Sequence, residues 1–291
     1  MARSGYATRL FTTTAFGLLL ALPALAANPT YGDLKAGAIS VAEQSGVQCE
    51  LCRDHLFDPA RVRARLPEGY RFVSAEAYAA EDSSVAALLA KHPSYSKLVV
   101  GSLCFMSVDT FLVDGHRVHG KGPTPMAFWW AHAERMPGTH PDSAMQGRTK
   151  WLQLGSWYST RGTDPERIRS TDPMAEFVDV KVTRLGPFQW RLRLPLGDEV
   201  VRAEVRGDGQ RVKRKSDGPG FMTVPSTGDA AGLFTVFTYF GHHHQAAVGT
   251  WGATGEGVFR SAFALPGEAS TFGTFYQDGW QAKSGLYRFQ R

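Results

Sequence analysis

One stretch of the sequence, residues 126–159, mixes charged and aromatic side chains in a way that could build a binding site. Its tryptophans are Trp129, Trp130, Trp151 and Trp157. Its candidate chemical groups are His132, Glu134, Arg148 and Lys150. Apolar walls with a few polar groups are typical of small-molecule pockets, although aromatic clusters also fill ordinary cores. In one strand, Trp151 and Trp157 would share a face unless a bulge intervenes.

These residue types suggest distinct roles. Lysine, glutamate and histidine can move protons, and lysine can also form covalent intermediates, so the candidate catalytic residues are Lys150, Glu134 and His132. Arg148 would hold an anionic group, while the four tryptophans would bind an apolar body. The stretch therefore predicts an amphipathic carboxylate as the ligand.

Two histidines, His242 and His244, are the candidate metal ligands. They alternate in a segment that we expect to be extended, so their side chains would point the same way. Neutral imidazoles bind zinc or iron, but no acidic residue lies between His244 and Glu256 to complete a site. The pattern leaves open a metal-dependent enzyme and, as the alternative, a polar strand end with no cofactor.

The chain has three cysteines, Cys49, Cys52 and Cys104. The Cys49–Cys52 pair has a CxxC spacing but neither the histidine of a haem-attachment motif nor the second ligand pair of a zinc site. In an exported protein such a pair is expected to be oxidised. We therefore predict a Cys49–Cys52 disulfide and a buried free thiol at Cys104.

The first 26 residues have the pattern of a secretory signal peptide. Arg3 and Arg9 precede an apolar run at 16–25, and an Ala-Leu-Ala cleavage site ends at Ala26. The run is too short to cross a bilayer. We expect a periplasmic or secreted protein that begins at Ala27 and has no transmembrane segment.

The charge pattern argues against nucleic-acid binding. The net charge of +5 falls to +3 without Arg3 and Arg9. The basic cluster at 211–215 is typical of a solvated hairpin loop, and no nucleic-acid-binding module accompanies it. The expected partner is a small molecule, and the oligomeric state is left open.

Strand patterns dominate the sequence after residue 98. Apolar and charged side chains alternate through 178–182, 190–194 and 201–206, as in sheets with one buried face. Further strands are expected at 233–240 and 257–264, and we predict at least ten antiparallel strands forming a barrel or cone.

Helix signals precede these strands. Asp58-Pro59 and Ser74 are helix starts, and weaker helical patterns run through 36–43 and 85–91. The predicted fold is mainly β (α+β): one domain with a helical N-terminal part at 27–97 and a large antiparallel barrel or cone at 98–291.

The order of these elements resembles the acetoacetate decarboxylase-like family. The segment 58–70 (DPARVRARLPEGY) is similar to the family's opening helix and corner, and 98–113 to its first strands. The Gly147-Arg148 pair is similar to its Gly-Arg motif, and 179–206 to the hairpin that follows. The resemblance covers about two-thirds of the chain after the signal peptide and implies a cone around a buried pocket.

The resemblance does not extend to the family's paired catalytic lysines. At their spacing this chain has Gly155 and Ser156. Three hypotheses follow: a lyase with altered chemistry that acts on a small carboxylate, a non-catalytic small-molecule-binding barrel, and a metal-dependent enzyme using His242 and His244.

Overall fold

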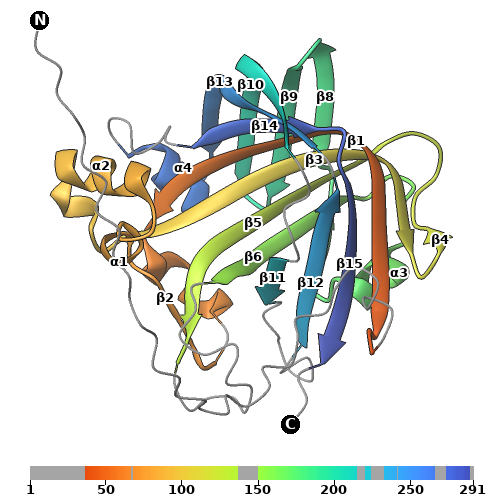
Figure 1. Cartoon of the computed structure of the whole chain (residues 1–291), viewed down its shortest axis with the longest axis horizontal. Helices are drawn as coiled ribbons and strands as arrows, with labels where there is room; N and C mark the ends of the chain where they lie inside the picture. Colours follow the sequence, from red (N-terminus) through yellow and green to blue (C-terminus); the bar gives the residue numbers. More distant parts are fainter. Residues whose placement is uncertain are drawn as a thin grey trace, which may run out of the picture.

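The computed structural model describes residues 37–66, 68–136, 150–214, 220–223, 233–240, 242–265 and 273–288, and these residues form a mainly β fold (Figure 1). The strands are β1 (Ser40–Phe57), β2 (Tyr70–Phe72), β3 (Val99–Val113), β4 (His116–Arg117), β5 (Thr124–Arg135), β6 (Lys150–Ser159), β7 (Ala175–Val178), β8 (Lys181–Gly186), β9 (Gln189–Leu196), β10 (Glu199–Arg214), β11 (Gly220–Thr223), β12 (Leu233–Phe240), β13 (His242–Thr254), β14 (Thr274–Asp278) and β15 (Gln281–Arg288). The helices are α1 (Ala75–Tyr78), α2 (Ser83–Lys91), α3 (Pro165–Thr171) and α4 (Val258–Phe263), with short 3-10 helices η2 (Pro59–Arg65) and η3 (Pro93–Tyr95).

The strands belong to one large mixed sheet. Its order is β4-β3-β5-β6-β11-β12-β15-β1-β14-β13-β10-β9-β8, and β1 also pairs with β3. β6 pairs in parallel with both β7 and β11, so the sheet is not purely antiparallel. The path ends at β4 and β8 and the sheet is not closed, so the mainly β prediction is confirmed but the barrel is not.

The longest strand lies in the part of the chain that we expected to be helical. β1 covers Ser40–Phe57, and the weak helix predicted at 36–43 is wrong. β1 pairs with β3 along one edge and with β15 and then β14 along the other. Two hydrogen-bonded neighbours stabilise the extended backbone, and this tertiary pairing outweighs a weak local helical preference.

Helix starts follow the local rules well. The carboxylate of Asp58 accepts a hydrogen bond from the Ala60 amide, and Ser74 caps α1 through the Ala77 amide. Asp164 caps α3 in the same way, with Pro165 at its first position. Side-chain oxygens at these N-caps satisfy amide groups that have no partner within the helix.

One predicted strand, 257–264, is the helix α4 instead. The carboxylate of Glu199 accepts a hydrogen bond of 2.6 Å from the Arg260 amide at its N-terminus. Phe259 and Ala262 on α4 are buried in the core. The local pattern of this segment is ambiguous between strand and helix. The hydrogen bond to the distant Glu199 and the burial of one helical face stabilise the helix.

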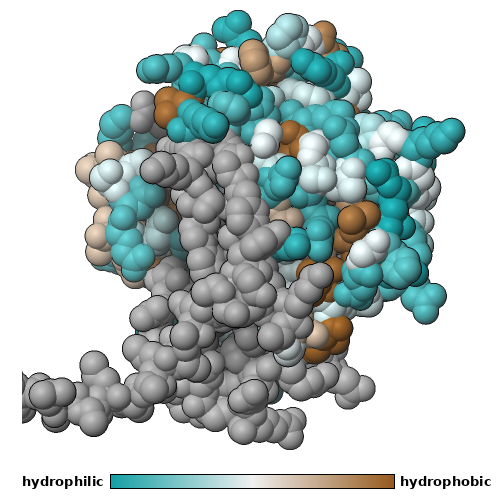
Figure 2. All heavy atoms as spheres, turned by 45° about the vertical axis from the view of Figure 1, so that its right-hand side comes forward, coloured by the Kyte–Doolittle hydropathy of each residue, from teal (hydrophilic) through white to brown (hydrophobic). Residues whose placement is uncertain are grey.

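The largest hydrophobic cluster, here called the inter-layer core, joins two layers of the fold. Its side chains come from β1, β3, β5 and β6 on one side and from β9, β10 and α4 on the other; they include Leu51, Trp129, Trp157, Trp190, Leu192 and Phe259. Figure 1 shows β8, β9, β10 and β13 above the long strands β3, β5 and β6. The face in Figure 2 is mostly hydrophilic, with scattered hydrophobic residues.

Candidate functional site

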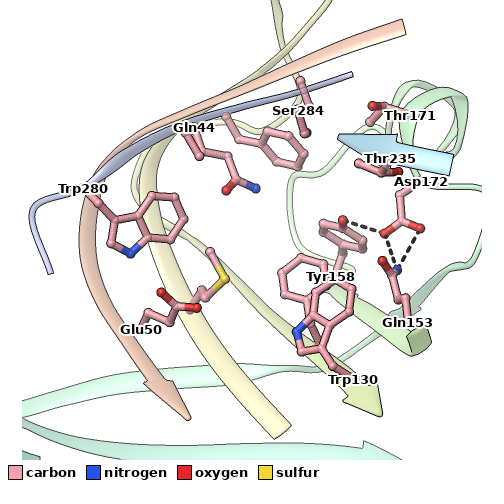
Figure 3. Close-up of a pocket in the computed structure, with 15 residues that line it drawn as sticks. Gln44, Glu50, Trp130, Gln153, Tyr158, Thr171, Asp172, Thr235, Trp280 and Ser284 are labelled. Atoms are coloured by element: carbon pink, nitrogen blue, oxygen red, sulfur yellow. Dashed lines mark hydrogen bonds between the residues drawn. The ribbon is translucent and has the colours of Figure 1, made fainter. Parts of the chain in front are cut away.

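A cavity of about 90 Å³ lies against the opposite face of the long strands from the inter-layer core. The aromatic side chains that line it are Phe111, Phe128, Trp130, Tyr158 and Trp280. The polar residues that line it are Gln44, Glu50, Gln153, Thr171, Asp172, Thr235 and Ser284 (Figure 3). The cavity is smaller than the roughly 150 Å³ that holds benzene in a protein interior, so it suits a small molecule.

Glu50 is the first carboxyl group of this cavity. A β-bulge between Val47 and Cys49 shifts the register of β1 just before it, and bulges re-aim the side chains that follow. The side chain is 7% exposed. Burial raises the pKa of Glu50 to about 7, and a hydrogen bond from Trp280 only partly offsets this. Its Oε2 is buried and has no hydrogen-bond partner.

Asp172 is the second carboxyl group, and it is well satisfied. Its Oδ2 accepts a hydrogen bond of 2.9 Å from the Tyr158 hydroxyl, and Gln153 Nε2 lies 3.2 Å from its Oδ1. The Met174 amide donates to the same carboxylate. Burial raises the pKa of Asp172, while its hydrogen bonds lower it. Burial and the neighbouring Asp172 both raise the pKa of Tyr158. Asp172 thus fixes the far wall of the cavity, across from Glu50 and Trp280 in Figure 3.

A disulfide lies beside Glu50, and it is not the one we predicted. Cys52 is bonded to Cys104, while Cys49 is a buried free thiol. In a strand, residues three apart point to opposite faces, so Cys49 faces the inter-layer core. Cys52 and Cys104 are direct partners across β1 and β3, with Cα atoms 4.0 Å apart. The Cys49–Cys52 pairing is therefore wrong.

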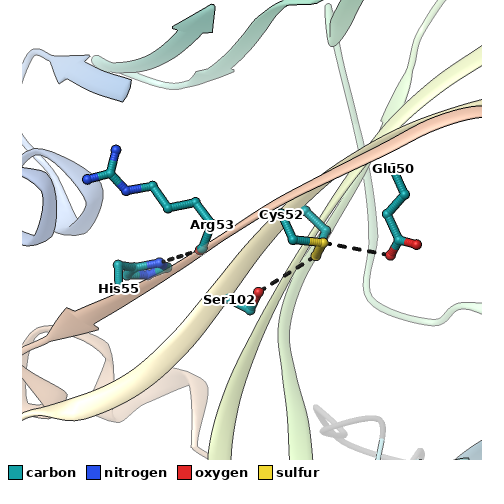
Figure 4. Close-up of a disulfide and its surroundings, with 6 residues drawn as sticks. Glu50, Cys52, Arg53, His55 and Ser102 are labelled. Atoms are coloured by element: carbon teal, nitrogen blue, oxygen red, sulfur yellow. Dashed lines mark hydrogen bonds between the residues drawn. A yellow bond between two sulfur atoms is a disulfide. The ribbon is translucent and has the colours of Figure 1, made fainter. Parts of the chain in front are cut away.

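Glu50 and the two disulfide cysteines, Cys52 and Cys104, form the one cluster of potential metal ligands found among the described residues. Cys52 Sγ lies 3.7 Å from Glu50 Oε1 (Figure 4). A disulfide sulfur carries no proton, so this is a contact and not a hydrogen bond. Cysteine binds metals as the thiolate, and both sulfurs are held in the disulfide, so neither acts as a metal ligand.

The other face of β1 packs against the inter-layer core. His55 is fully buried, with Nδ1 3.2 Å from the Arg53 carbonyl and Nε2 3.2 Å from the Trp129 indole nitrogen. Nδ1 must carry a proton to donate to the Arg53 carbonyl, and Nε2 must be unprotonated to accept from the Trp129 indole N–H. The imidazole is therefore neutral. Burial lowers the pKa of His55 to about 3. His55 and Arg53 lie on the opposite side of β1 from the disulfide (Figure 4).

The structure separates three of the four tryptophans of the predicted pocket. Trp130 lines the cavity, whereas Trp129 and Trp157 are buried in the inter-layer core. Position 151 pairs with His132 and Trp157 with Ala127, which lie on opposite faces of β5. The register shift between Trp129 and Trp130 is the bulge that removes the expected shared face.

Of the predicted catalytic residues, His132 and Glu134 do not line the cavity. His132 is buried with its ring 3.7 Å from the ring of Tyr78, and burial lowers its pKa to about 4. Glu134 pairs with Arg71 at 2.5 Å on the surface side of β5. The backbone of Lys150 begins β6 opposite Ala133.

Arg148 lies outside the described residues. His242 pairs with Arg214 in the backbone register between β13 and β10. The ring of His244 stacks on Phe275 at 5.5 Å. These residues remain site predictions from the sequence.

Sequence reasoning missed Glu50 and Asp172. Glu50 lies within the CxxC motif, between Cys49 and Cys52, in a segment with no clear alternation because β1 is buried on both faces. A signal for Asp172 was present: Asp164-Pro165 repeats the Asp-Pro start at 58–59 and predicts the helix that ends next to it.

Comparison with solved structures finds two enzymes at low identity. An acetoacetate decarboxylase from Legionella pneumophila is 9% identical over 96% of this chain and 97% of that chain, with a TM-score of 0.49. The enduracididine biosynthesis enzyme MppR, complexed with pyruvate, is 11% identical over 85% of this chain and 87% of that chain, with a TM-score of 0.43.

These neighbours agree with the weak resemblance to the acetoacetate decarboxylase-like family. No protein-family model and no curated protein sequence matches the chain. Because both TM-scores lie below 0.5, the function of the cavity rests on its own residues.

Proposed function

We propose that the chain binds a small organic molecule in the cavity between β1, β3, β5, β6 and β15. The observation that supports this most directly is Glu50 Oε2, a buried oxygen without a hydrogen-bond partner in an aromatic-walled space. Buried polar atoms in proteins are almost always hydrogen-bonded. A ligand that donates to Glu50 would satisfy this oxygen, and the aromatic walls would bury its apolar part.

A cavity-filling variant tests this proposal. Ala282 on β15 lines the cavity and is 8% exposed. Ala282→Leu adds roughly three carbon atoms to the space, so small organic compounds that bind the wild type should lose at least tenfold in affinity. Ala246→Leu, the same change at an exposed position of β13, is the matched control. Equal binding by both variants would place the ligand elsewhere.

Lyase chemistry is a second proposal, and it depends on Lys150. This lysine begins β6, the strand that also carries Gln153 and Tyr158 of the cavity. A lysine that forms a Schiff base with a keto acid is trapped covalently by borohydride. The expected result is trapping in the wild type and none in Lys150→Ala; labelling of both proteins alike would reject Lys150 as the nucleophile.

We also propose that the protein is exported, as the signal-peptide pattern predicts. The Cys52–Cys104 disulfide is compatible with this, because such bonds persist in oxidising compartments. Among the described residues, no helix is both long and apolar enough to cross a membrane. Cell fractionation and N-terminal sequencing should find a periplasmic or secreted chain beginning at Ala27; a cytoplasmic chain that keeps Met1 would contradict export.

A further inference from the structure

The described residues that line the cavity carry negative charge and no positive charge. Glu50 and Asp172 are their ionisable acids, and lysine, arginine and histidine are absent among them. A buried carboxylate needs a compensating charge or hydrogen-bond donor. Asp172 has its donors in Tyr158, Gln153 and the Met174 amide. Glu50 Oε2 has none.

The protein groups around Glu50 do not meet this need. The nearest sulfur belongs to a disulfide and has no proton to donate. Trp280 offers a single indole N–H to the carboxyl group. The second oxygen is therefore open to a donor that enters the cavity.

Aromatic rings form the rest of the wall and contact one another. Phe128 stacks on Trp130 at 5.7 Å and meets Tyr158 edge-on at 5.7 Å. Phe111 stacks on Tyr158 at 6.1 Å. Ring faces carry partial negative charge and attract organic ammonium groups, and recognition of such cations by aromatic cages is common.

We propose that the cavity selects a small organic cation, such as a primary alkylammonium, whose N–H groups donate to Glu50 and whose apolar part packs on the aromatic wall. This deepens the proposed small-molecule binding and rests on it. It also replaces the carboxylate expected from the sequence and excludes a keto acid from this cavity, because the described wall would repel an anion. The cavity volume limits the ligand to roughly three to five heavy atoms.

The ionisation of Glu50 gives this proposal a pH dependence. Its carboxyl group titrates with a pKa of about 7 because it is buried. The other titratable groups around it are Cys49 on its own strand and, across the cavity, Tyr158 on β6 and Asp172 after α3. Cys52 and Cys104 are in the disulfide. An ammonium ion binds the ionised carboxylate, so its affinity should rise about tenfold from pH 6 to pH 8.

Three matched probes with one ethyl group test the inference: ethylammonium, ethanol and propionate. NMR titration of the oxidised full chain at pH 8 should give at least tenfold tighter binding of the ammonium than of the alcohol, and weaker binding of the carboxylate. In Glu50→Gln the preference for the ammonium should fall to twofold or less, and its pH dependence should disappear. Glu43→Gln is the matched control, because Glu43 is on the same strand but pairs with Lys283 outside the cavity.

The outcomes separate this inference from the proposed function. Equal or tighter binding of the alcohol or the carboxylate by the wild type would overturn the cation while leaving small-molecule binding intact. A preference for the ammonium that survives in Glu50→Gln would overturn the role of Glu50. If none of the three probes binds the wild type, the inference and the proposed function both fail for ligands of this size.

Discussion

Trp129 and Trp130 are neighbours on β5, yet they lie in opposite surroundings. Trp129 is buried in the inter-layer core, where its indole N–H donates to neutral His55. Trp130 is half-buried and lines a cavity that also contains Glu50, with an oxygen that has no partner. The Trp129 side of the strand is packed into the core, and the Trp130 side borders a cavity lined partly by polar groups. This difference identifies the functional face more clearly than the number of aromatic residues does.

The largest expected effect comes from removing one of these two indoles. Trp129→Ala should lower the free energy of unfolding by about 3–5 kcal/mol, because it leaves a hole in a packed core and deprives His55 of its donor. Trp130→Ala should cost roughly half as much, since its side chain already borders a cavity. Urea unfolding of both variants measures the difference. Equal losses would show that the two faces are packed alike.

The disulfide should contribute the next largest effect. Replacing both Cys52 and Cys104 by alanine should lower the free energy of unfolding by about 2–4 kcal/mol, because the open chain gains conformational entropy. Cys49→Ala, on the other face, removes only a small buried group and should cost about 1 kcal/mol. Thermal unfolding compares the variants, and peptide mapping without reductant should find Cys52 joined to Cys104. A Cys49–Cys52 peptide would contradict the structure.

Glu50→Gln should stabilise the protein at alkaline pH. The folded pKa of about 7 lies above the ordinary glutamate value of 4.5, so the folded state binds the proton more tightly and loses stability as the pH rises between these values. The glutamine variant has no such loss, and above pH 7 it should be more stable by on the order of 3 kcal/mol. Below pH 4.5 this advantage should vanish. Unfolding curves from pH 4 to pH 8 test it, with Glu43→Gln expected to show no comparable trend.

The smallest effect is expected at Glu134, at the far end of β5. Its ion pair with Arg71 is partly exposed to water, and such pairs contribute about 0–1 kcal/mol. Glu134→Gln should therefore change stability by less than about 1 kcal/mol, and ligand binding in the cavity should not change. A large loss of binding would restore Glu134 as a site residue.

Much of the fold could be predicted from local patterns. Alternation located β9 closely, the predicted strand 233–240 matches β12, and the caps at Asp58 and Ser74 mark helix starts in the structure. β1 escaped prediction because a strand buried on both faces shows no alternation. The helix α4 escaped because its stabilising partner, Glu199, is distant in the sequence.

The site was harder to predict than the fold. The aromatic composition of the segment pointed to Trp130. Composition does not distinguish Trp130 from its neighbour Trp129, whose side chain points to the opposite face of β5. A bulge also changes which residues of β6 share a face. Glu50 and Asp172 meet in one cavity only through the arrangement of β1, β6 and α3. A single sequence does not reveal such long-range proximity. The Asp-Pro motif before α3 is a local signal for the helix that positions Asp172, but our prediction did not use it.

Formation of the Cys52–Cys104 bond also depends on the register in which β1 pairs with β3. A one-residue slip between β1 and β3 would turn the two sulfurs to opposite faces, and it would exchange Glu50 for Leu51 at the cavity. A two-residue slip would keep the face but separate the Cα atoms by about 7–8 Å, beyond the usual reach of a disulfide. The Cys52–Cys104 disulfide therefore forms only in molecules in which β1 and β3 pair in the native register. In each chain that contains this disulfide, the register of β1 therefore places Glu50 at the cavity.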